Sequence, residues 1–225
     1  MPEILYEKMN YTQLFPVNLN LQNRKCLVIG GGKVAERKVE SLLLCEAEIL
    51  VVSPKITQNL EKLAQQGMIN FVNREYKTDD LDGCFMVISA TNDQQANQRV
   101  ASDCLSRNIL INVVDDPPMC SFTVPSVLRR GSLCIAISTS GKSPTLAKKI
   151  REELENTFGP EYAEFLELMG EIRDQVMRDI PEEEKRRMVF ECLVNSDILD
   201  SIRKGNKDLL AKQVAQCISL ATKED

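Results

Sequence analysis

Three consecutive glycines, Gly30, Gly31 and Gly32, follow a short apolar run at residues 26–29 and precede an amphipathic helical pattern. With Lys33, Val34 and Ala35 they match G-x-G-x-x-A. In this motif Gly30 permits a tight turn, and Gly32 lets a phosphate approach the backbone. The alanine allows the helix to pack closely on the strand, and the helix N-terminus offers free N–H groups to phosphates. A strand, a glycine turn and a helix in this order predict a Rossmann-type domain that binds a dinucleotide. A glycine turn without a ligand is the alternative.

The same alternation of apolar runs and amphipathic stretches continues along the first half of the chain. Further β-branched or apolar runs lie at 49–52, 69–72, 85–90 and 109–114, and helical patterns lie at 60–65 and 92–105. Strands that alternate with helices favour a parallel sheet covered by helices. We therefore expect an α/β fold for this half.

The pattern changes after the prolines at 117–118. Two β-like stretches, 122–128 and 133–138, come first. Ser143 and Pro144 then form a helix start, with Ser as the cap and Pro at the first position, and everything beyond is helical. We predict a Rossmann domain at 1–114, a small α+β dimerisation region at 115–150 and a helical domain at 151–225.

The residues after the second predicted strand bear on the choice of dinucleotide. An Asp or Glu is expected there to bind the adenosine ribose. This chain has Ser53, Pro54 and Lys55 instead. Ser53 can bond a ribose hydroxyl and Lys55 could accept a 2′-phosphate, so the choice between NAD and NADP stays open; Lys55 can equally be an ordinary surface lysine.

The cysteine and histidine content limits the chemistry. The chain has eight cysteines, of which no two are closer than fourteen positions, and no histidine. The spacing excludes CxxC metal and redox sites, so we expect free cytosolic thiols and no metal site. Acid–base chemistry must then rely on carboxylates, lysines, tyrosines or water.

Charge and hydropathy indicate the surroundings of the protein. A net charge of −5 argues against nucleic-acid binding. Residues 115–150 are nevertheless basic, with 5 cationic and 2 anionic side chains, and would suit an anionic ligand. Because the N-terminal stretch lacks a signal-peptide pattern and no window is apolar enough to span a membrane, we expect a cytoplasmic protein without membrane contact.

Several short motifs occur in order between about residues 14 and 155: the segments 28–38, 90–93, 97–100, 112–115, 121–122, 125–126 and 138–144. Together they resemble the motifs of precorrin-2 dehydrogenases, the N-terminal modules of siroheme synthases. The resemblance implies NAD-dependent oxidation of precorrin-2 to sirohydrochlorin on the route to siroheme or related tetrapyrroles, and a homodimer. It also implies a cofactor domain followed by an interlocking dimerisation region and a helical tail.

The resemblance also implies roles for individual residues. Lys33, Val34, Pro54 and Lys55 would contact the cofactor, and we add Gly30, Gly31, Gly32, Ser53, Ala90 and Thr91 to these contacts. The aspartate implicated in catalysis would be Asp115. Its position supports this role independently, since ligands of doubly wound sheets lie beyond the carboxyl ends of the strands. A carboxylate there could accept the proton that dehydrogenation releases; alternatively, Asp115 merely builds a turn before the two prolines.

The substrate that the resemblance implies carries eight carboxylates and needs cations and hydrogen-bond donors. Arg129, Arg130, Lys142, Lys148 and Lys149 could supply the charge. We predict substrate contacts at Asn112, Ser138, Thr139, Ser140 and Lys142; a linker with a helix cap is the alternative for residues 138–143. Two other functions compete with the dehydrogenase: a regulatory nucleotide-binding module without turnover, and a chelatase or a bifunctional dehydrogenase and chelatase.

Overall fold

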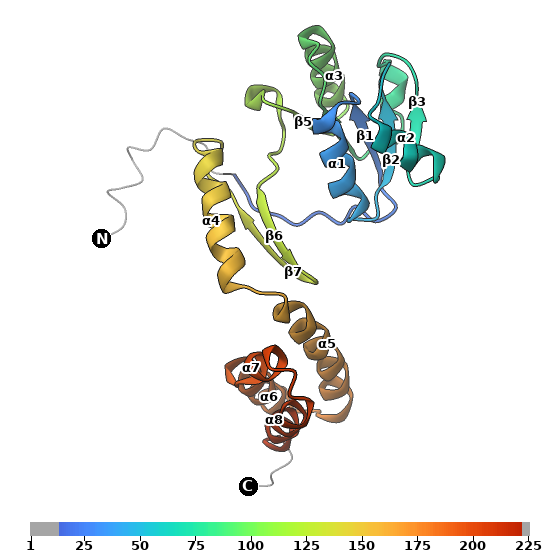
Figure 1. The fold of residues 1–225 in the computed structure, drawn as a ribbon. Helices are drawn as coiled ribbons and strands as arrows, with labels where there is room; N and C mark the ends of the chain where they lie inside the picture. The colour runs from blue at the N-terminus through green and yellow to red at the C-terminus, as the bar shows by residue number, and fades with distance from the viewer. Residues whose placement is uncertain (1–13, 222–225) are drawn as a thin grey trace, which may run out of the picture. The chain divides into compact units, whose positions relative to one another are not determined.

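The computed structural model describes residues 14–221 and divides the chain into two compact units, Met1–Val124 and Pro125–Asp225. We call them unit 1 and unit 2 and describe each by itself (Figure 1). Among the described residues, no helix is long and apolar enough to cross a membrane. The first thirteen residues, which belong to the predicted Rossmann range 1–114, lie outside the described part.

Unit 1 is built on a parallel sheet of five strands in the order β3-β2-β1-β4-β5. In chain order its elements are β1 (Lys25–Ile29), α1 (Lys33–Leu43), β2 (Glu48–Val52), α2 (Gln58–Gln65), β3 (Asn70–Val72), the 3-10 helix η2 (Thr78–Leu81), β4 (Met86–Ser89), α3 (Gln94–Ser106), β5 (Leu110–Val113) and the 3-10 helix η3 (Pro117–Met119). The central strand β1 pairs with β2 on one side and β4 on the other. This is the predicted Rossmann-type fold, with the order of the strands reversing at β1.

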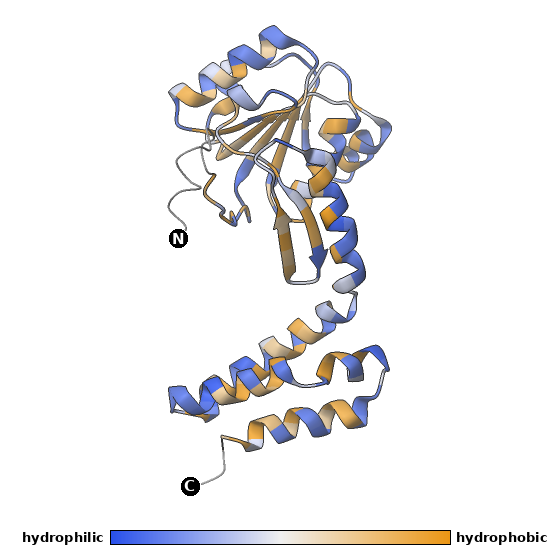
Figure 2. Cartoon of the chain, turned by 90° about the vertical axis from the view of Figure 1, so that its left-hand side faces the viewer, coloured by the Kyte–Doolittle hydropathy of each residue, from blue (hydrophilic) through white to orange (hydrophobic). Residues whose placement is uncertain are grey.

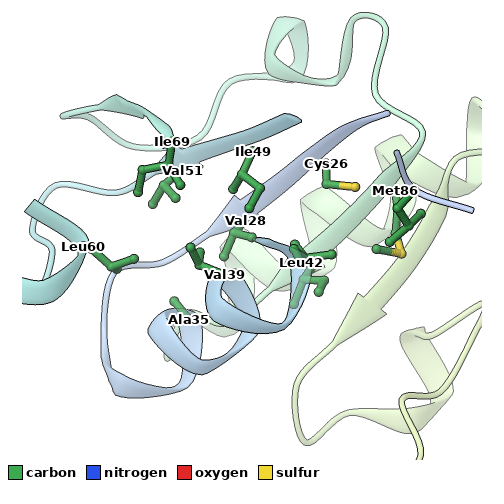
Figure 3. Packing of buried hydrophobic residues seen from close by; sticks show 12 residues of the cluster. Cys26, Val28, Ala35, Val39, Leu42, Ile49, Val51, Leu60, Ile69 and Met86 are labelled. Carbon is green, nitrogen blue, oxygen red and sulfur yellow. The ribbon is translucent and has the colours of Figure 1, made fainter. Parts of the chain in front are cut away.

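The strands are apolar on both faces because helices cover both faces, as is usual in parallel sheets. On one face, Ala35, Val39 and Leu42 of α1 pack with Leu60 of α2 against the sheet, as Figure 3 shows. On the other face, Val100 and Cys104 of α3 pack against Leu27 and its neighbours. Figure 2 shows the strands of the sheet as the orange layer between helices with blue outer faces. The core therefore lies in two layers, one on each side of the sheet.

One predicted strand is displaced. We expected β structure at 122–128, but β6 covers Ser126–Arg130. The segment before it is tied to β5 instead: the backbone N–H of Ser121 donates to the Ile111 carbonyl at 2.9 Å, and the Asn112 amide donates to the Phe122 carbonyl at 3.0 Å. Because Pro125 has no N–H to add to a ladder, the strand starts only after it.

Unit 2 begins with a two-stranded antiparallel sheet of β6 and β7 (Leu133–Ile137), followed by α4 (Pro144–Thr157). The Ser143 hydroxyl accepts a hydrogen bond from the Leu146 N–H at 3.2 Å, and Pro144 occupies the first turn. The predicted helix start is confirmed, because the cap satisfies one of the N–H groups that an α-helix leaves free.

The rest of unit 2 is helical, as predicted. It contains α5 (Glu161–Asp179), α6 (Glu183–Asn195), α7 (Ile198–Arg203) and α8 (Lys207–Ser219). Phe165, Ile172 and Val176 of α5 are buried in a common core with α6, α7 and α8. Leu209 of α8 is 43% exposed and does not belong to this core.

The expectation that all cysteines are free thiols is also wrong. Cys192 of α6 and Cys217 of α8 form a disulfide, with 5.5 Å between their Cα atoms. The other six cysteines are free. The pair lies 25 residues apart in the sequence, and only the packing of α6 against α8 brings the two sulfur atoms together.

Candidate active site

A cleft of about 520 Å³ opens at the carboxyl ends of β1, β2 and β4 in unit 1. This is the edge at which doubly wound sheets bind their ligands, next to the strand where the order reverses. The lining includes predicted cofactor residues and several that we did not predict. The lining residues are Ile29, Gly30, Val52, Ser53, Pro54, Glu75, Tyr76, Thr91, Asp93, Gln95, Ala96 and Arg99.

Gly30 and Gly31 allow close approach of neighbouring backbone segments. Gly30 has a φ of +108°, and a Cβ on it would lie 2.4 Å from the carbonyl oxygen of Ala90. A Cβ on Gly31 would lie 2.0 Å from the carbonyl oxygen of Lys55. The loops after β2 and β4 thus press directly on the glycine turn, and no larger residue fits at either position.

Gly32 differs from its two neighbours. A Cβ added there would meet no atom within 4 Å, and its φ of −82° suits any residue. Neither packing nor backbone conformation within unit 1 requires glycine at this position. Because Gly32 is the N-cap of α1, the open space lies where the free N–H groups of the helix would receive an anion. The turn fits a dinucleotide pyrophosphate.

Lys33 and Val34 form the first turn of α1. The Lys33 ammonium donates to a carboxylate oxygen of Glu36 at 3.0 Å, although the lysine side chain is largely exposed. Glu36 is buried and also accepts a hydrogen bond from the hydroxyl of Thr57, the N-cap of α2. The bonds from Thr57 and Lys33 lower the pKa of the Glu36 carboxyl and keep it ionised. Glu36 therefore fastens α1 to α2, a role that the motif alone did not reveal.

The residues after β2 occupy different positions. Ser53 is buried, and its hydroxyl donates to the carbonyl of Lys55 at 2.7 Å, which stabilises the turn. Ser53 and Pro54 line the cleft, whereas the Lys55 side chain is exposed and is not part of the lining. The contribution of Lys55 that the structure displays is its carbonyl group against Gly31.

A buried amide holds the turn after β4, where we predicted contacts from Ala90 and Thr91. The Ser89 hydroxyl donates to the Asn97 side-chain oxygen at 2.6 Å, and the Asn97 amide donates to the Thr91 carbonyl at 3.1 Å. Asn97 belongs to one of the motifs on which the resemblance rests, but we assigned it no role. It fixes the position of the Thr91 backbone at the cleft.

Arg99 and Tyr76 form a part of the cleft that the sequence did not indicate. An Arg99 guanidinium N–H donates to the Tyr76 carbonyl at 2.6 Å, and the guanidinium carbon lies 5.2 Å from the centroid of the Tyr76 ring. The Tyr76 hydroxyl donates to Asp103 at 2.9 Å, and burial, followed by this bond, raises its pKa. Tyr76 is thus a neutral packing residue, and the contact depends on a loop that no local pattern marked.

Asp115 lies in the turn after β5, at the same edge of the sheet. Its φ is +61°, in the left-handed region that non-glycine residues seldom adopt, and the residue is exposed. Asn112, which we predict to contact substrate, donates its side-chain amide to the Phe122 carbonyl. The Cys120 thiol accepts from the Val113 N–H at 3.2 Å, and burial raises its pKa, so it is a structural thiol. These contacts hold the segment after Asp115 against β5.

The remaining predicted substrate residues lie in unit 2, between β7 and α4. Ser140 and Gly141 have φ values of +50° and +78°. The Ser138 and Thr139 hydroxyls accept hydrogen bonds from the N–H groups of Ser140 and Ser143, both at 3.1 Å. The loop is therefore organised by its own hydroxyl groups, including those of the cap. Asp115 belongs to unit 1, whereas these residues and Lys142 belong to unit 2, so a shared substrate site stays a prediction.

Metal-ligating side chains do not cluster in the part of the chain that the structure describes. Residues 14–221 contain no group of three or more His, Cys, Asp or Glu side chains that could hold a metal ion.

Comparison with known proteins accounts for nearly the whole chain. Residues 17–126 match a family described as putative NAD(P)-binding, residues 130–157 the sirohaem biosynthesis protein central region, and residues 161–218 the sirohaem synthase dimerisation region. The chain belongs to the family of siroheme synthases and precorrin-2 dehydrogenases. The resemblance seen in the sequence is confirmed, and unit 1 carries the NAD(P)-binding domain of this family.

Individual relatives agree with this assignment. The siroheme synthase 1 of Serratia proteamaculans is 37% identical over 201 residues, which are 89% of this chain and 42% of the relative. The siroheme synthase of Thioalkalivibrio sulfidiphilus is 37% identical over 194 residues, which are 86% of this chain and 40% of the relative. This chain thus spans about two fifths of the length of these curated relatives.

A solved structure, the precorrin-2 dehydrogenase SirC, has 26% identity and a TM-score of 0.76, and the match covers 90% of this chain and 100% of SirC. The predicted fold class is confirmed. The matched family regions begin and end at residues other than those of our three predicted parts, so the bounds 1–114, 115–150 and 151–225 stay a prediction.

Proposed function

We propose that this chain oxidises precorrin-2 to sirohydrochlorin, with NAD as the hydride acceptor, in the cytoplasm and on the route to siroheme. The reaction removes a hydride, which NAD takes up to become NADH when it is bound, and a proton, which a base must accept. Asp115 is the proposed base. Gly30, Gly31, Gly32, Lys33, Val34, Ser53, Pro54, Ala90 and Thr91 are the proposed residues around the cofactor.

The position of Asp115 relative to the glycine turn carries the proposal. Gly30 follows β1 and Asp115 follows β5, two strands away at the same edge, which corresponds to about 10 Å at the usual spacing between strands. A dinucleotide whose pyrophosphate lies at Gly32 can extend over this distance toward Asp115. The left-handed backbone of Asp115 adds support, because unusual backbone conformations of non-glycine residues cluster at active sites.

The lining of the cleft supports NAD rather than NADP. Lys55, the candidate partner for a 2′-phosphate, does not line the cleft, whereas the carboxylate residues Glu75 and Asp93 do. The guanidinium of Arg99, which also lines the cleft, donates to the Tyr76 carbonyl. A phosphate and a carboxylate in one cleft repel each other. NAD, which lacks this phosphate, is therefore the proposed cofactor.

The proposed assembly is a homodimer. Residues 161–218, which match the dimerisation region, form the helices α5 to α8 of unit 2. Sedimentation analysis of the purified chain tests this proposal; a monomer at micromolar concentration would contradict it.

Anaerobic turnover of precorrin-2 tests the function, with cofactor reduction and sirohydrochlorin absorption followed together. Stoichiometric appearance of both, with preference for NAD over NADP, is the expected result. Cofactor binding without turnover would refute the enzyme and favour a regulatory nucleotide-binding module. Addition of ferrous or cobaltous ion to the product in the same preparation tests the bifunctional dehydrogenase and chelatase.

The role of Asp115 is tested separately by Asp115→Asn, with Asp116→Asn as the matched control from the same turn. Loss of a general base lowers rates by about a hundredfold or more. We expect this loss in kcat for Asp115→Asn only, with the Kd for NAD unchanged in both variants. Equal activity of the two variants would leave Asp115 as a turn residue.

A further inference from the structure

We propose that Lys38 of α1 binds a carboxylate of the tetrapyrrole beside Asp115. This inference rests on the proposed function, since it concerns the substrate of that reaction. Nothing in the glycine motif assigns Lys38 a role, and it lies outside the cleft that the cofactor would occupy.

The direction of Lys38 follows from the geometry of α1. Ala35, Val39 and Leu42 face the sheet (Figure 3). Glu36 lies on the flank of the helix that contacts Thr57 of α2. Successive residues of an α-helix are about 100° apart, so Lys38 is about 200° from Glu36 and lies on the opposite flank.

That opposite flank faces the side of the sheet where Asp115 lies. Because α2 leads from β2 to β3, it covers the β2 side, and the strands on the other side of β1 are β4 and β5. Val114 and Phe122, on either side of the turn after β5, pack against the same hydrophobic cluster as Val39 and Leu42. The segment that contains Asp115 therefore lies next to the Lys38 flank of α1.

The electrostatic surroundings of Lys38 agree with this placement. The side chain is half-buried, and burial, followed by the charge of Arg37, lowers the pKa of its ammonium, whereas the negative charge of Asp115 raises it. Asp115 is thus close enough to interact with Lys38. The two groups form no ion pair within 4.0 Å, so Asp115 does not neutralise Lys38 directly.

Lys38 also differs from cations that the sequence suggested as partners of the cofactor or the substrate. Within residues 14–221, the Lys38 ammonium makes no hydrogen bond or ion pair. Lys33, in contrast, forms an ion pair with Glu36. On α4, Lys148 pairs with Glu152, and Lys149 pairs with Glu153. The Arg130 guanidinium donates to the Phe158 carbonyl at 2.9 Å. A half-buried cation without a bonded partner is unfavourable, and an anion bound next to it removes this cost. A carboxylate of the substrate would supply that anion.

Steady-state kinetics with three variants test the proposal. Lys38→Met keeps the length of the side chain without its charge, Lys38→Arg keeps a charge, and Arg37→Met is the matched control one residue away on the exposed face of α1. For Lys38→Met we expect KM for precorrin-2 and Kd for sirohydrochlorin to rise at least about tenfold, as for loss of a charged hydrogen bond. The kcat and the Kd for NAD should stay within about twofold of those of the unmodified protein. Lys38→Arg should retain most of the affinity, and Arg37→Met all of it.

The outcomes separate this inference from the proposed function. If the unmodified protein binds sirohydrochlorin and Lys38→Met binds it equally well, the Lys38 site is refuted and the function stands. If kcat falls with a displaced pH profile while KM is unchanged, Lys38 acts on Asp115 and not on the substrate, which also refutes the proposal. A lower Tm with unchanged KM assigns Lys38 to structure alone. If the unmodified protein neither binds sirohydrochlorin nor turns over precorrin-2, the function and the inference fall together.

Discussion

Substitution of Gly32 by alanine should weaken NAD binding without destabilising the protein. A Cβ at this position meets no protein atom within 4 Å, and the backbone has an ordinary φ of −82°. Alanine in place of glycine restricts the unfolded chain, which stabilises by about 0.4–1 kcal/mol, but alanine is a poorer N-cap by a similar amount. The two effects offset each other, so the free energy of unfolding without ligand should change by less than about 1 kcal/mol.

In the presence of NAD, Gly32→Ala should be clearly less stable than the unmodified protein. NAD at a hundred times its Kd stabilises the native protein by about 2.7 kcal/mol. If the methyl group raises Kd about thirtyfold by occupying the space of the pyrophosphate, the same concentration contributes only about 0.9 kcal/mol. Thermal unfolding with and without NAD, together with calorimetric titration, measures both quantities.

Gly31→Ala is the matched contrast, because its Cβ would lie 2.0 Å from the Lys55 carbonyl oxygen and force the backbone to move. We expect this variant to lose about 1–3 kcal/mol of stability even without cofactor. If Gly32→Ala binds NAD like the unmodified protein, or if it is destabilised as much as Gly31→Ala, the assignment of the open space at Gly32 to the pyrophosphate is refuted.

Two further predictions concern stability. Burial opposes ionisation of Asp80, but the hydrogen bonds from Arg74 and from the Lys77 N–H, with the charges of Arg74 and Lys25, together outweigh it and lower the pKa of the carboxyl. Its stabilisation is fully present above the unfolded pKa of about 4 and is lost as the pH falls through the lower pKa of the folded state. Asp80→Asn should therefore cost about 2 kcal/mol at pH 7 in urea unfolding and less at pH 3; an equal cost at both pH values would contradict this. In unit 2, reduction of the Cys192–Cys217 disulfide, which closes a loop of 25 residues, should cost about 3 kcal/mol. Dithiothreitol should lower the Tm of the unmodified protein but not of a variant with serine at both positions, and an equal response of the two proteins would refute a structural role for the bond.

Local sequence patterns predicted most of the fold because they depend on neighbouring residues. The runs at β1, β2, β4 and β5 are apolar on both faces, and Ser143 with Pro144 carries a complete helix start within two residues. The start of β6 could not be predicted from the apolar pattern alone. Pro125 marks it locally, but the segment before Pro125 is held by hydrogen bonds of Ser121 and Phe122 to Ile111 and Asn112 of β5, which the alternation of apolar residues does not record.

In the candidate site, too, local spacing predicted some residues, whereas contacts between separate segments determine the roles of others. The glycine turn was predicted because its function requires particular residue types at fixed spacing. Asn97 and Arg99 were not assigned roles, since each acts by bonding a backbone carbonyl in another segment, Thr91 and Tyr76. The Asn112 side chain has a structural partner, the Phe122 carbonyl, that its sequence position does not indicate, and its contact with the substrate stays a prediction.

The first three turns of α1 explain why the motif that begins at Gly30 extends well beyond the glycines. The N-terminus of the helix is open at Gly32 toward a phosphate, and Ala35 and Val39 face the sheet. On one flank, Glu36 accepts a hydrogen bond from Thr57 of α2. On the other flank, Lys38 is proposed to bind the substrate. Arg37 lies on the exposed face of the helix. Because α1 packs on the core and on α2 and is proposed to contact both cofactor and substrate, a substitution on each of these faces should affect a different measurable property. A substitution at Arg37 on the exposed face should affect none of them.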